Sequence, residues 1–307
     1  MKLIQAANEL NPGTRKVCLA IGVFDGVHLG HQQIIRQTVA DARQHDAVAM
    51  VVTFDRHPNA VVAPDRVPPQ IQSRSQKQRA MAALGVNALL EIPFDRAFSE
   101  KSGETFIREL ARDLGKIQSV CVGADFVFGH RRTGHVPLLQ TLGQELQFQV
   151  HGLAAVSLDG QVVSSTRIRE MIRAGNFDAA SQMLGRPYAI SGRILEGDRL
   201  GRQLGFPTAN LDVTGLILPP YGVYSAVTQW QEQRYQVALN IGVRPTVASA
   251  QPLLRVEAHL LDFKGDLYGA ELELELGVKL RDEKRFASPA ELRSQIARDV
   301  AAVRAAQ

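Results

Sequence analysis

The sequence lacks long hydrophobic runs and has little cysteine, and each shortage excludes a class of protein. Its longest nearly apolar stretches, such as residues 17–24 and 47–54, are far shorter than the roughly 18 residues that span a bilayer. Cys18 and Cys121 each lie in a short apolar run, where a thiol serves as a small buried hydrophobe. We therefore expect no membrane span and no disulfide framework.

The sequence also lacks a secretory signal and a strong net charge. The N-terminus has no basic segment followed by an apolar core and a cleavage site, so we expect a cytoplasmic protein. The 35 Lys and Arg nearly balance the 31 Asp and Glu, and a net charge of +4 without basic runs argues against a nucleic-acid partner. With 45% hydrophobic and 21% charged residues, the 307 residues suffice for two packed domains.

β-Branched apolar runs alternate with amphipathic helical stretches from the start of the chain to about residue 150. This alternation is typical of parallel strands joined by crossover helices, so it predicts a doubly wound α/β domain. The predicted strands are 17–23, 47–54, 88–92 and 119–123, and the predicted helices are 32–43, 75–84, 103–114, 137–146, 166–174 and 177–183. Gly185, Arg186 and Pro187 then break the helical period, which places the first domain at residues 1–184.

Short strands with period-two alternation follow this break, most clearly at residues 271–276. They are punctuated by glycine and proline, which predicts a mainly antiparallel β-barrel domain over residues 185–307. Ser288 and Pro289 precede apolar residues at helical spacing, so a helix over 288–305 should close the domain.

The loop at residues 22–31 (Gly-Val-Phe-Asp-Gly-Val-His-Leu-Gly-His) joins a predicted strand to a predicted helix. Such a junction directs backbone N–H groups and the positive end of a helix at one point, which favours a bound phosphate. The loop is neither a P-loop nor a dinucleotide fingerprint, because no Gly-Lys-Ser/Thr follows and its glycines are spaced by four. His28 and His31 add donors for phosphate oxygens, although the pair also fits helix caps or half of a zinc site.

A second hydroxyl-rich cluster, Ser-Ser-Thr-Arg-Ile-Arg at residues 164–169, opens a predicted helix. By itself it also fits an ordinary helix cap with exposed arginines. Nucleotidyltransferases of the histidine-glycine-histidine type carry one motif after the first strand and a Ser/Thr-Arg motif at a late helix, and both reach one triphosphate. The sequence resembles that superfamily in both places and in that order.

The string at residues 22–31 more closely resembles the adenylyltransferase half of the bacterial bifunctional riboflavin kinase/FAD synthetase family, and residues 52–58 and 122–129 match its later motifs. The resemblance implies that His28 and His31 contact the ATP phosphates. The other residues of the ATP site that it implies are Gly22, Phe24, Asp25, Gly30, Asp125, Ser165, Thr166 and Arg169, of which the last three would hold the triphosphate and the leaving pyrophosphate.

The sequence departs from that family at three places. Residues 55–56 are Asp-Arg where the family has Glu-Pro, residues 70–72 are Gln-Ile-Gln where it has Arg-Leu-Thr, and Ala124 replaces an aromatic residue. The triphosphate motifs are intact, so the departures concern the flavin and ribose contacts. Phe54 and Phe128 are candidates for stacking on the isoalloxazine ring, and a phenylalanine at a strand end also fits the hydrophobic core.

Residues 197–211 are rich in glycine and end in a proline-fixed turn. Glycines permit close backbone approach to phosphate, while Pro207 stiffens the segment from which Thr208 and Asn210 project. Mg²⁺ is held by one or two protein oxygens together with phosphates and water, and a Thr hydroxyl with an Asn carbonyl meets that demand. The Pro-Thr-Ala-Asn string by itself also fits a surface turn.

Arg255, Glu257 and His259 share one face of a predicted strand at residues 253–261, a pattern that also fits a solvated polar face. Four segments look like the successive motifs of the riboflavin kinase fold, namely residues 205–210, 221–224, 240–246 and 257–269. The family resemblance therefore covers nearly the whole chain.

This resemblance implies that Thr208 and Asn210, with Gly205 nearby, bind Mg²⁺ and the ATP phosphates, and that Glu257 is the base on the terminal ribityl hydroxyl. A primary alcohol is a weak nucleophile, so a positioned carboxylate contributes roughly 10²–10⁴-fold to its reaction. Asn240 and Arg244 are candidates for flavin contact, or for ordering a loop.

We therefore predict an enzyme that uses ATP and Mg²⁺, and neither zinc nor haem, to convert riboflavin to FMN and FMN to FAD. Two alternatives remain. One is a flavin- or nucleotide-binding sensor without turnover, and the other is a single-activity adenylyltransferase with a decayed kinase domain. Intact Thr208, Asn210 and Glu257 argue against decay, and the oligomeric state does not follow from the sequence.

Overall fold

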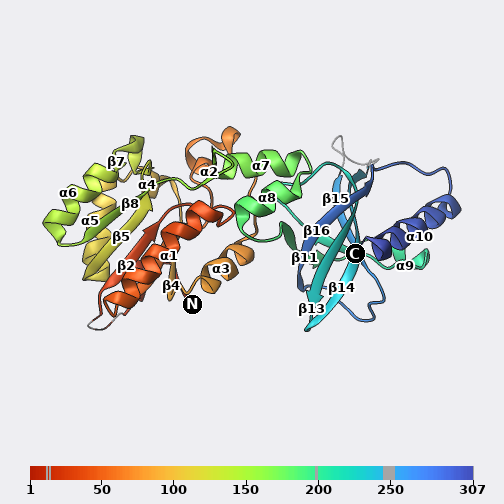
Figure 1. Cartoon of the computed structure of the whole chain (residues 1–307), viewed down its shortest axis with the longest axis horizontal. Helices are drawn as coiled ribbons and strands as arrows, with labels where there is room; N and C mark the ends of the chain where they lie inside the picture. The colour runs from red at the N-terminus through yellow and green to blue at the C-terminus, as the bar shows by residue number, and fades with distance from the viewer. Residues whose placement is uncertain (12, 14, 198–199, 245–252, 307) are drawn as a thin grey trace. The chain divides into compact units, whose positions relative to one another are not determined.

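The computed structural model describes residues 1–11, 13, 15–197, 200–244 and 253–306, which divide into two compact units (Figure 1). One unit comprises Met1–Pro69 and Arg74–Ser165, and the other comprises Gln70–Ser73 and Thr166–Gln307. Two helices, α7 (Ser165–Arg173) and α8 (Phe177–Leu184), fall almost wholly in the second unit. The domain boundary between residues 184 and 185 stays a prediction.

The first unit contains a six-stranded sheet in the order β1-β4-β3-β2-β5-β8, in which every neighbouring pair is parallel. Its strands are β1 (Lys2–Ile4), β2 (Val17–Ile21), β3 (Val48–Phe54), β4 (Ala88–Ile92), β5 (Ile117–Gly123) and β8 (Gln149–Leu153). The four central strands match the predicted ones to within two residues at each end. The two edge strands were not predicted, because β1 has three residues and β8 carries a glycine among polar residues.

Helices cover both faces of this sheet. Residues of α1 (Leu29–Gln44) and α3 (Arg74–Ala83) share one buried cluster, while α5 (Gly103–Leu114) and α6 (Val136–Leu146) belong to the cluster on the other face. The doubly wound α/β prediction is therefore confirmed. The shorter elements are α2 (Asn59–Val62), α4 (Arg96–Ser99) and the strand pairs β6 (Val127–Phe128) with β7 (Gly134–His135) and β9 (Ser157–Leu158) with β10 (Gln161–Val162).

The second unit contains a closed, wholly antiparallel barrel in the order β11-β12-β15-β14-β13-β16, as predicted. Its elements are β11 (Ala189–Leu195), α9 (Leu200–Gln203), β12 (Ala209–Asp212), β13 (Gly222–Trp230), β14 (Gln233–Arg244), β15 (Leu253–Leu260), β16 (Glu271–Arg281) and α10 (Pro289–Ala305). The closing helix matches its prediction, since Ser288 Oγ accepts a hydrogen bond from Glu291 N and Pro289 occupies the first turn.

Aromatic packing explains why α8 lies in the same unit as the barrel. The Phe177 ring stacks on Tyr188 and lies against Tyr224, with both centroid distances at 5.7 Å. Tyr188 is buried, which raises its pKa, and its hydroxyl donates to Ile217 O at 3.0 Å. Residues 70–73 join the same unit through hydrogen bonds between the backbones of Gln70, Gly215 and Ile217.

A buried ion pair fastens α10 to the barrel. Arg281, at the end of β16, donates from Nη2 to Asp299 Oδ2 at 2.7 Å and from Nε to Oδ1 at 3.0 Å. Asp299 is 6% exposed and also accepts a hydrogen bond from Gln295. A bidentate pair with this support fixes both the position and the rotation of the helix.

Asp299→Asn should destabilise the barrel by about 3 kcal/mol, because it leaves the Arg281 guanidinium largely buried without its counter-charge. Urea unfolding followed by tryptophan fluorescence reports on the barrel, since the chain's single tryptophan is Trp230 of β13. The matched control is Asp262→Asn, which breaks an exposed ion pair to Arg304 of the same helix and should not move the midpoint. Equal shifts in the two variants would contradict this account.

Candidate active sites

The loop that follows β2 is held in a strained conformation. Phe24 and Val27 are buried non-glycine residues with left-handed backbone angles, φ 53° and 39°. Such residues cost about 1 kcal/mol or more each and persist where their surroundings hold them. A Cβ on Gly22 would lie 3.1 Å from the Phe24 ring, so the glycine makes room for that ring. The loop is therefore a preformed element with a fixed shape.

The two predicted histidines lie together at the first turn of α1. His28 caps the helix, because its Nδ1 accepts a hydrogen bond from His31 N at 3.4 Å. The helix-cap alternative is therefore correct for His28. Their rings stack with centroids 3.6 Å apart at 20°. A Cβ on Gly30 would lie 3.2 Å from His28 Cε1, which explains a glycine between the histidines.

His31 is uncharged in this position. Burial lowers its pKa well below the usual value, and the neighbouring His28 and Lys77 lower it further. Its Nδ1 is buried without a hydrogen-bond partner among the described residues. His31 thus offers a neutral ring nitrogen for a hydrogen bond to an incoming ligand, at the end of α1 where the helix dipole is positive.

Other predicted residues of this site lie at the same edge of the sheet. Ser165 Oγ donates to Asp25 O at 2.9 Å, so the start of α7 is tied to the loop. Asp125 is exposed two residues beyond β5, the strand that pairs with β2. Thr166 and Arg169 belong to the second unit, so their grouping with the loop stays a prediction.

Phe54 and Phe128 lie in an aromatic cluster that is not apparent from the sequence. Phe54, at the end of β3, contacts Phe94 and Phe98 with centroids 5.2 and 5.7 Å apart. Phe128 stacks on Phe126 at 5.1 Å, and a Cβ on Gly134 would lie 2.6 Å from its ring. Both phenylalanines therefore have core contacts, and their contact with flavin stays a prediction.

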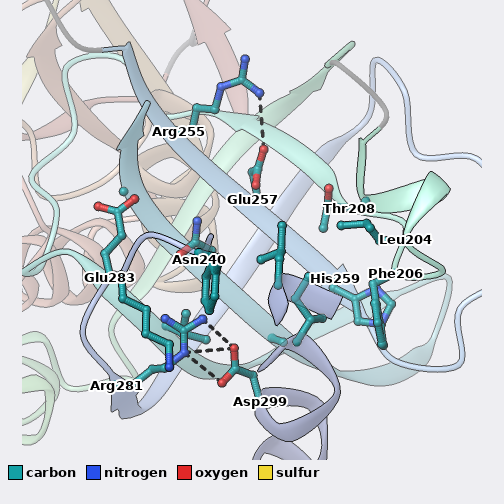
Figure 2. Close-up of a pocket in the computed structure, with 18 of the residues that line it drawn as sticks. Leu204, Phe206, Thr208, Asn240, Arg255, Glu257, His259, Arg281, Glu283 and Asp299 are labelled. Atoms are coloured by element: carbon teal, nitrogen blue, oxygen red, sulfur yellow. Dashed lines mark hydrogen bonds and ion pairs between the residues drawn. The ribbon is translucent and has the colours of Figure 1, made fainter. Parts of the chain in front are cut away.

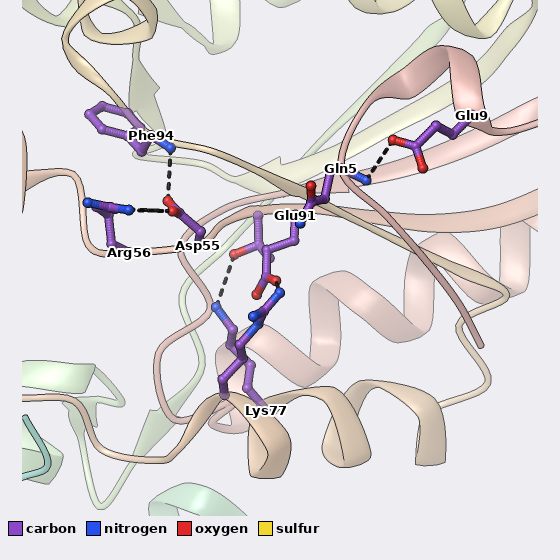
Figure 3. Close-up of polar contacts among 9 residues, drawn as sticks. Gln5, Glu9, Asp55, Arg56, Lys77, Glu91 and Phe94 are labelled. Carbon is purple, nitrogen blue, oxygen red and sulfur yellow. Dashed lines mark hydrogen bonds and ion pairs between the residues drawn. The ribbon is translucent and has the colours of Figure 1, made fainter. Parts of the chain in front are cut away.

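The departure at residues 55–56 has a structural role. Asp55, which follows β3, accepts from Phe94 N at 2.8 Å and from Arg56 Nη2 at 2.9 Å, so it joins the ends of β3 and β4 (Figure 3). Partial burial raises the pKa of Asp55, but the hydrogen bonds from Arg56 and Phe94 outweigh burial and hold it below its usual value.

Three side chains on the α1 face of the sheet could ligate a metal. Asp41, Cys121 and His151 place one ligand atom each within 4.8 Å of one another. Ser119 Oγ already donates to Asp41 Oδ2 at 2.7 Å, and burial raises the pKa of Cys121 to about 12. The group is therefore a hydrogen-bonded network around a carboxylate, with the thiol protonated.

The second site is a cavity of about 360 Å³ between the barrel wall and α10 (Figure 2). Asn210, Glu257 and Asn240 form one row across it, because Glu257 is level with Asn210 of β12 and with Asn240 of β14. Thr208 also lines the cavity. The structure thus brings four of the predicted kinase residues together, and the polar face of β15 lines a cavity.

The glycine-rich segment packs against the predicted metal ligands. A Cβ on Gly197 would lie 2.2 Å from Asn210 Nδ2, and one on Gly201 would lie 3.1 Å from Thr208 Oγ1. Gly205 has φ +89°, which favours glycine at that turn. Close backbone approach is therefore observed, here to the side chains of Thr208 and Asn210.

Several cavity residues had no predicted role. Arg255 Nη1 lies 3.5 Å from Glu257 Oε1, and His259 Nδ1 lies 2.8 Å from Pro207 O. Arg255 and His259 alternate with Glu257 in the sequence, so their place on the same strand face could be predicted. Arg281 and Asp299 line the same cavity from β16 and α10, which the sequence does not indicate. Arg244 ends β14, but its side chain lies outside the described residues.

Two sites suited to phosphate chemistry, on two different folds, place the chain among two-domain transferases that act on nucleotides. Family models agree, since the model for FAD synthetase matches residues 11–167 and the model for riboflavin kinase matches residues 184–307. The chain belongs to the bifunctional riboflavin kinase/FMN adenylyltransferase family.

Relatives match over nearly the full chain. The enzyme of that name from Escherichia coli K12 is 38% identical over 301 residues, which is 97% of this chain and 96% of the relative. The one from Pseudomonas fluorescens is 39% identical over 305 residues, 99% of this chain and 97% of the relative.

One solved structure is also similar over the whole chain. It is titled a macrolide-efflux protein from Streptococcus pneumoniae and has a TM-score of 0.81 and 27% identity, with 99% of each chain covered. Among the described residues of the present chain, no helix is both long and apolar enough to cross a membrane.

Replacing His28 and His31 together by alanine should stop FAD formation while FMN formation continues, because the pair would serve adenylyl transfer alone. Chromatography of the flavins made from riboflavin should show FMN accumulating without FAD. Unimpaired FAD synthesis would remove these histidines from the mechanism. Zinc found by elemental analysis in the wild type but not in the variant would revive the metal interpretation of the pair.

Proposed function

We propose that the barrel domain phosphorylates riboflavin to FMN and that the α/β domain adenylylates FMN to FAD with release of pyrophosphate. The observation that carries the kinase assignment is the row Asn210, Glu257 and Asn240, which puts a carboxylate between two amides inside a cavity. The stacked histidines at the start of α1 carry the adenylyltransferase assignment.

In the proposed kinase reaction, Glu257 accepts the proton of the terminal ribityl hydroxyl as its oxygen attacks the γ-phosphorus of ATP, and ADP leaves. Glu257 suits this role because it is partly buried and its contact to Arg255 is long, at 3.5 Å. Asn240 lies one strand away and would orient the flavin substrate. The carboxylate thus meets the alcohol without a competing short hydrogen bond to Arg255.

Thr208 and Asn210 fit a Mg²⁺ site. The donor set is a hydroxyl and an amide carbonyl, and the packing of Gly197 and Gly201 against these side chains leaves them little freedom. When bound, Mg²⁺ would neutralise charge on the ATP phosphates. Gly205 would allow the neighbouring backbone to approach those phosphates.

In the proposed adenylyl transfer, a phosphate oxygen of FMN attacks the α-phosphorus of ATP, and pyrophosphate leaves with the electrons of the broken bond. His28 and His31 would donate to phosphate oxygens as charge develops on them. Ser165, Thr166 and Arg169 would hold the triphosphate and the leaving group. The loop residues Gly22, Phe24, Asp25 and Gly30, with Asp125 beyond β5, would complete the ATP site.

The direct test is to incubate the protein with riboflavin, ATP and Mg²⁺ and to separate the flavins by chromatography. FMN and then FAD should appear. Tight flavin binding without product would support a sensor instead, and FAD formation only from added FMN would support a decayed kinase. The proposed partners are thus riboflavin, FMN, FAD and ATP, while a cytoplasmic location stays a prediction.

Glu257→Gln should abolish FMN formation and leave conversion of FMN to FAD nearly unchanged, because the base acts only on the ribityl alcohol. A loss of about 10²-fold or more in kcat is expected. The matched control is Glu275→Gln, the same change at an exposed position on β16 of the same barrel, which should keep both activities. Equal loss of both activities in Glu257→Gln would indicate a structural role for this residue.

A further inference from the structure

Lys77 of α3 lies at the carboxyl ends of the strands, beside the loop of residues 22–31 (Figure 3). Its Nζ donates to Thr53 Oγ1 at 3.4 Å, and Thr53 Oγ1 donates to Val23 O at 3.1 Å. Val23 belongs to the loop that ends in the two histidines, and Thr53 is fully buried. Two consecutive contacts therefore fix the lysine ammonium relative to the loop.

The ammonium of Lys77 forms no close ion pair among the described residues. Three carboxylates attract it, those of Glu91, Asp25 and Asp55, but Glu91 is already paired with Arg74. Among the described residues, the ammonium makes only the long hydrogen bond to Thr53, although it has three protons to donate. Two donors therefore remain for a ligand.

Lys77 supplies a positive charge, which His31 lacks. The pair offers ring nitrogens, but His31 is held neutral, and the charge of Lys77 contributes to that neutrality. Burial lowers the pKa of Lys77 itself, and the three carboxylates oppose the shift. A bound phosphate would favour the charged form further, because an opposite charge nearby raises the pKa of an amine.

Lys77 also lies on a particular side of the loop. It contacts Thr53 of β3, whereas Asp125 follows β5, the strand on the other side of β2. Lys77 therefore lies between the end of β3 and the loop that carries the histidines. An ammonium in this position would lie beside a phosphate that the loop binds.

We propose that Lys77 is a catalytic residue of adenylyl transfer, and that its ammonium contacts the α-phosphate of ATP. The new bond joins an FMN phosphate oxygen to the α-phosphorus, and the bond from that phosphorus to the bridging oxygen breaks. Pyrophosphate takes the electron pair. Lys77 gives up no proton and offsets the negative charge that two phosphates bring together. This inference rests on the proposed function of the first domain.

Lys77→Met should lower kcat for conversion of FMN to FAD by about 10²-fold or more, while the dissociation constant for FMN changes far less. Lys77→Arg should recover part of the rate, because it restores the charge with altered geometry. The matched control is Lys116→Met, which removes an exposed lysine just before β5, at the opposite edge of the sheet, and should leave the rate unchanged. FMN formation by the same chain checks only that the barrel is intact, and a cooperative thermal unfolding transition followed by circular dichroism checks that the first domain is folded.

A purely structural role for Lys77 makes a different prediction. If the lysine only balances Glu91, then Lys77→Met combined with Glu91→Gln should restore FAD synthesis, since the buried carboxylate is then uncharged and Arg74, which loses its partner, is half exposed to solvent. A catalytic Lys77 predicts that the double variant stays as slow as Lys77→Met. Recovery in the double variant, or a normal rate in Lys77→Met, would overturn the inference. No FAD from the wild-type protein would overturn the proposed function instead.

Discussion

The parallel register of the first sheet is the constraint on which its site depends. Ile21 of β2 is level with Val52 of β3, and Ala20 is level with Cys121 of β5, so neighbouring strands end at nearly the same height. The loops that follow them therefore emerge side by side. The histidine loop, Asp55 and Asp125 are far apart in the sequence, and it is this register that brings them to one edge.

The barrel also brings polar residues from different strands together, but it does so with antiparallel strands. There the polar groups come from one cross-strand row and not from loops at strand ends. The row consists of Asn210, Glu257 and Asn240, and α10 covers the cavity that it faces. The ion pair between Arg281 and Asp299 holds that cover in place. Each domain thus positions rigid polar groups for phosphate chemistry, one at strand ends and one on a strand face.

Periodicity in the sequence predicted the fold well where apolar runs were long, as for the four central strands and the closing helix. It failed for the edge strand β8, whose polar residues and glycine hide the pattern. The histidines were predictable because they are contiguous with their loop. Lys77 was not, since its place beside Thr53 depends on packing between α3 and β3, and the resemblance, not spacing, joined Asn210 to Glu257.

The central claim is that one chain carries out two successive transfers from ATP at separate sites. Supplying riboflavin with ATP labelled at either the γ- or the α-phosphate tests it most directly. The account predicts γ-label in FMN and in FAD, and α-label in FAD alone. Label from the α-phosphate in FMN, or FAD without γ-label, would contradict it.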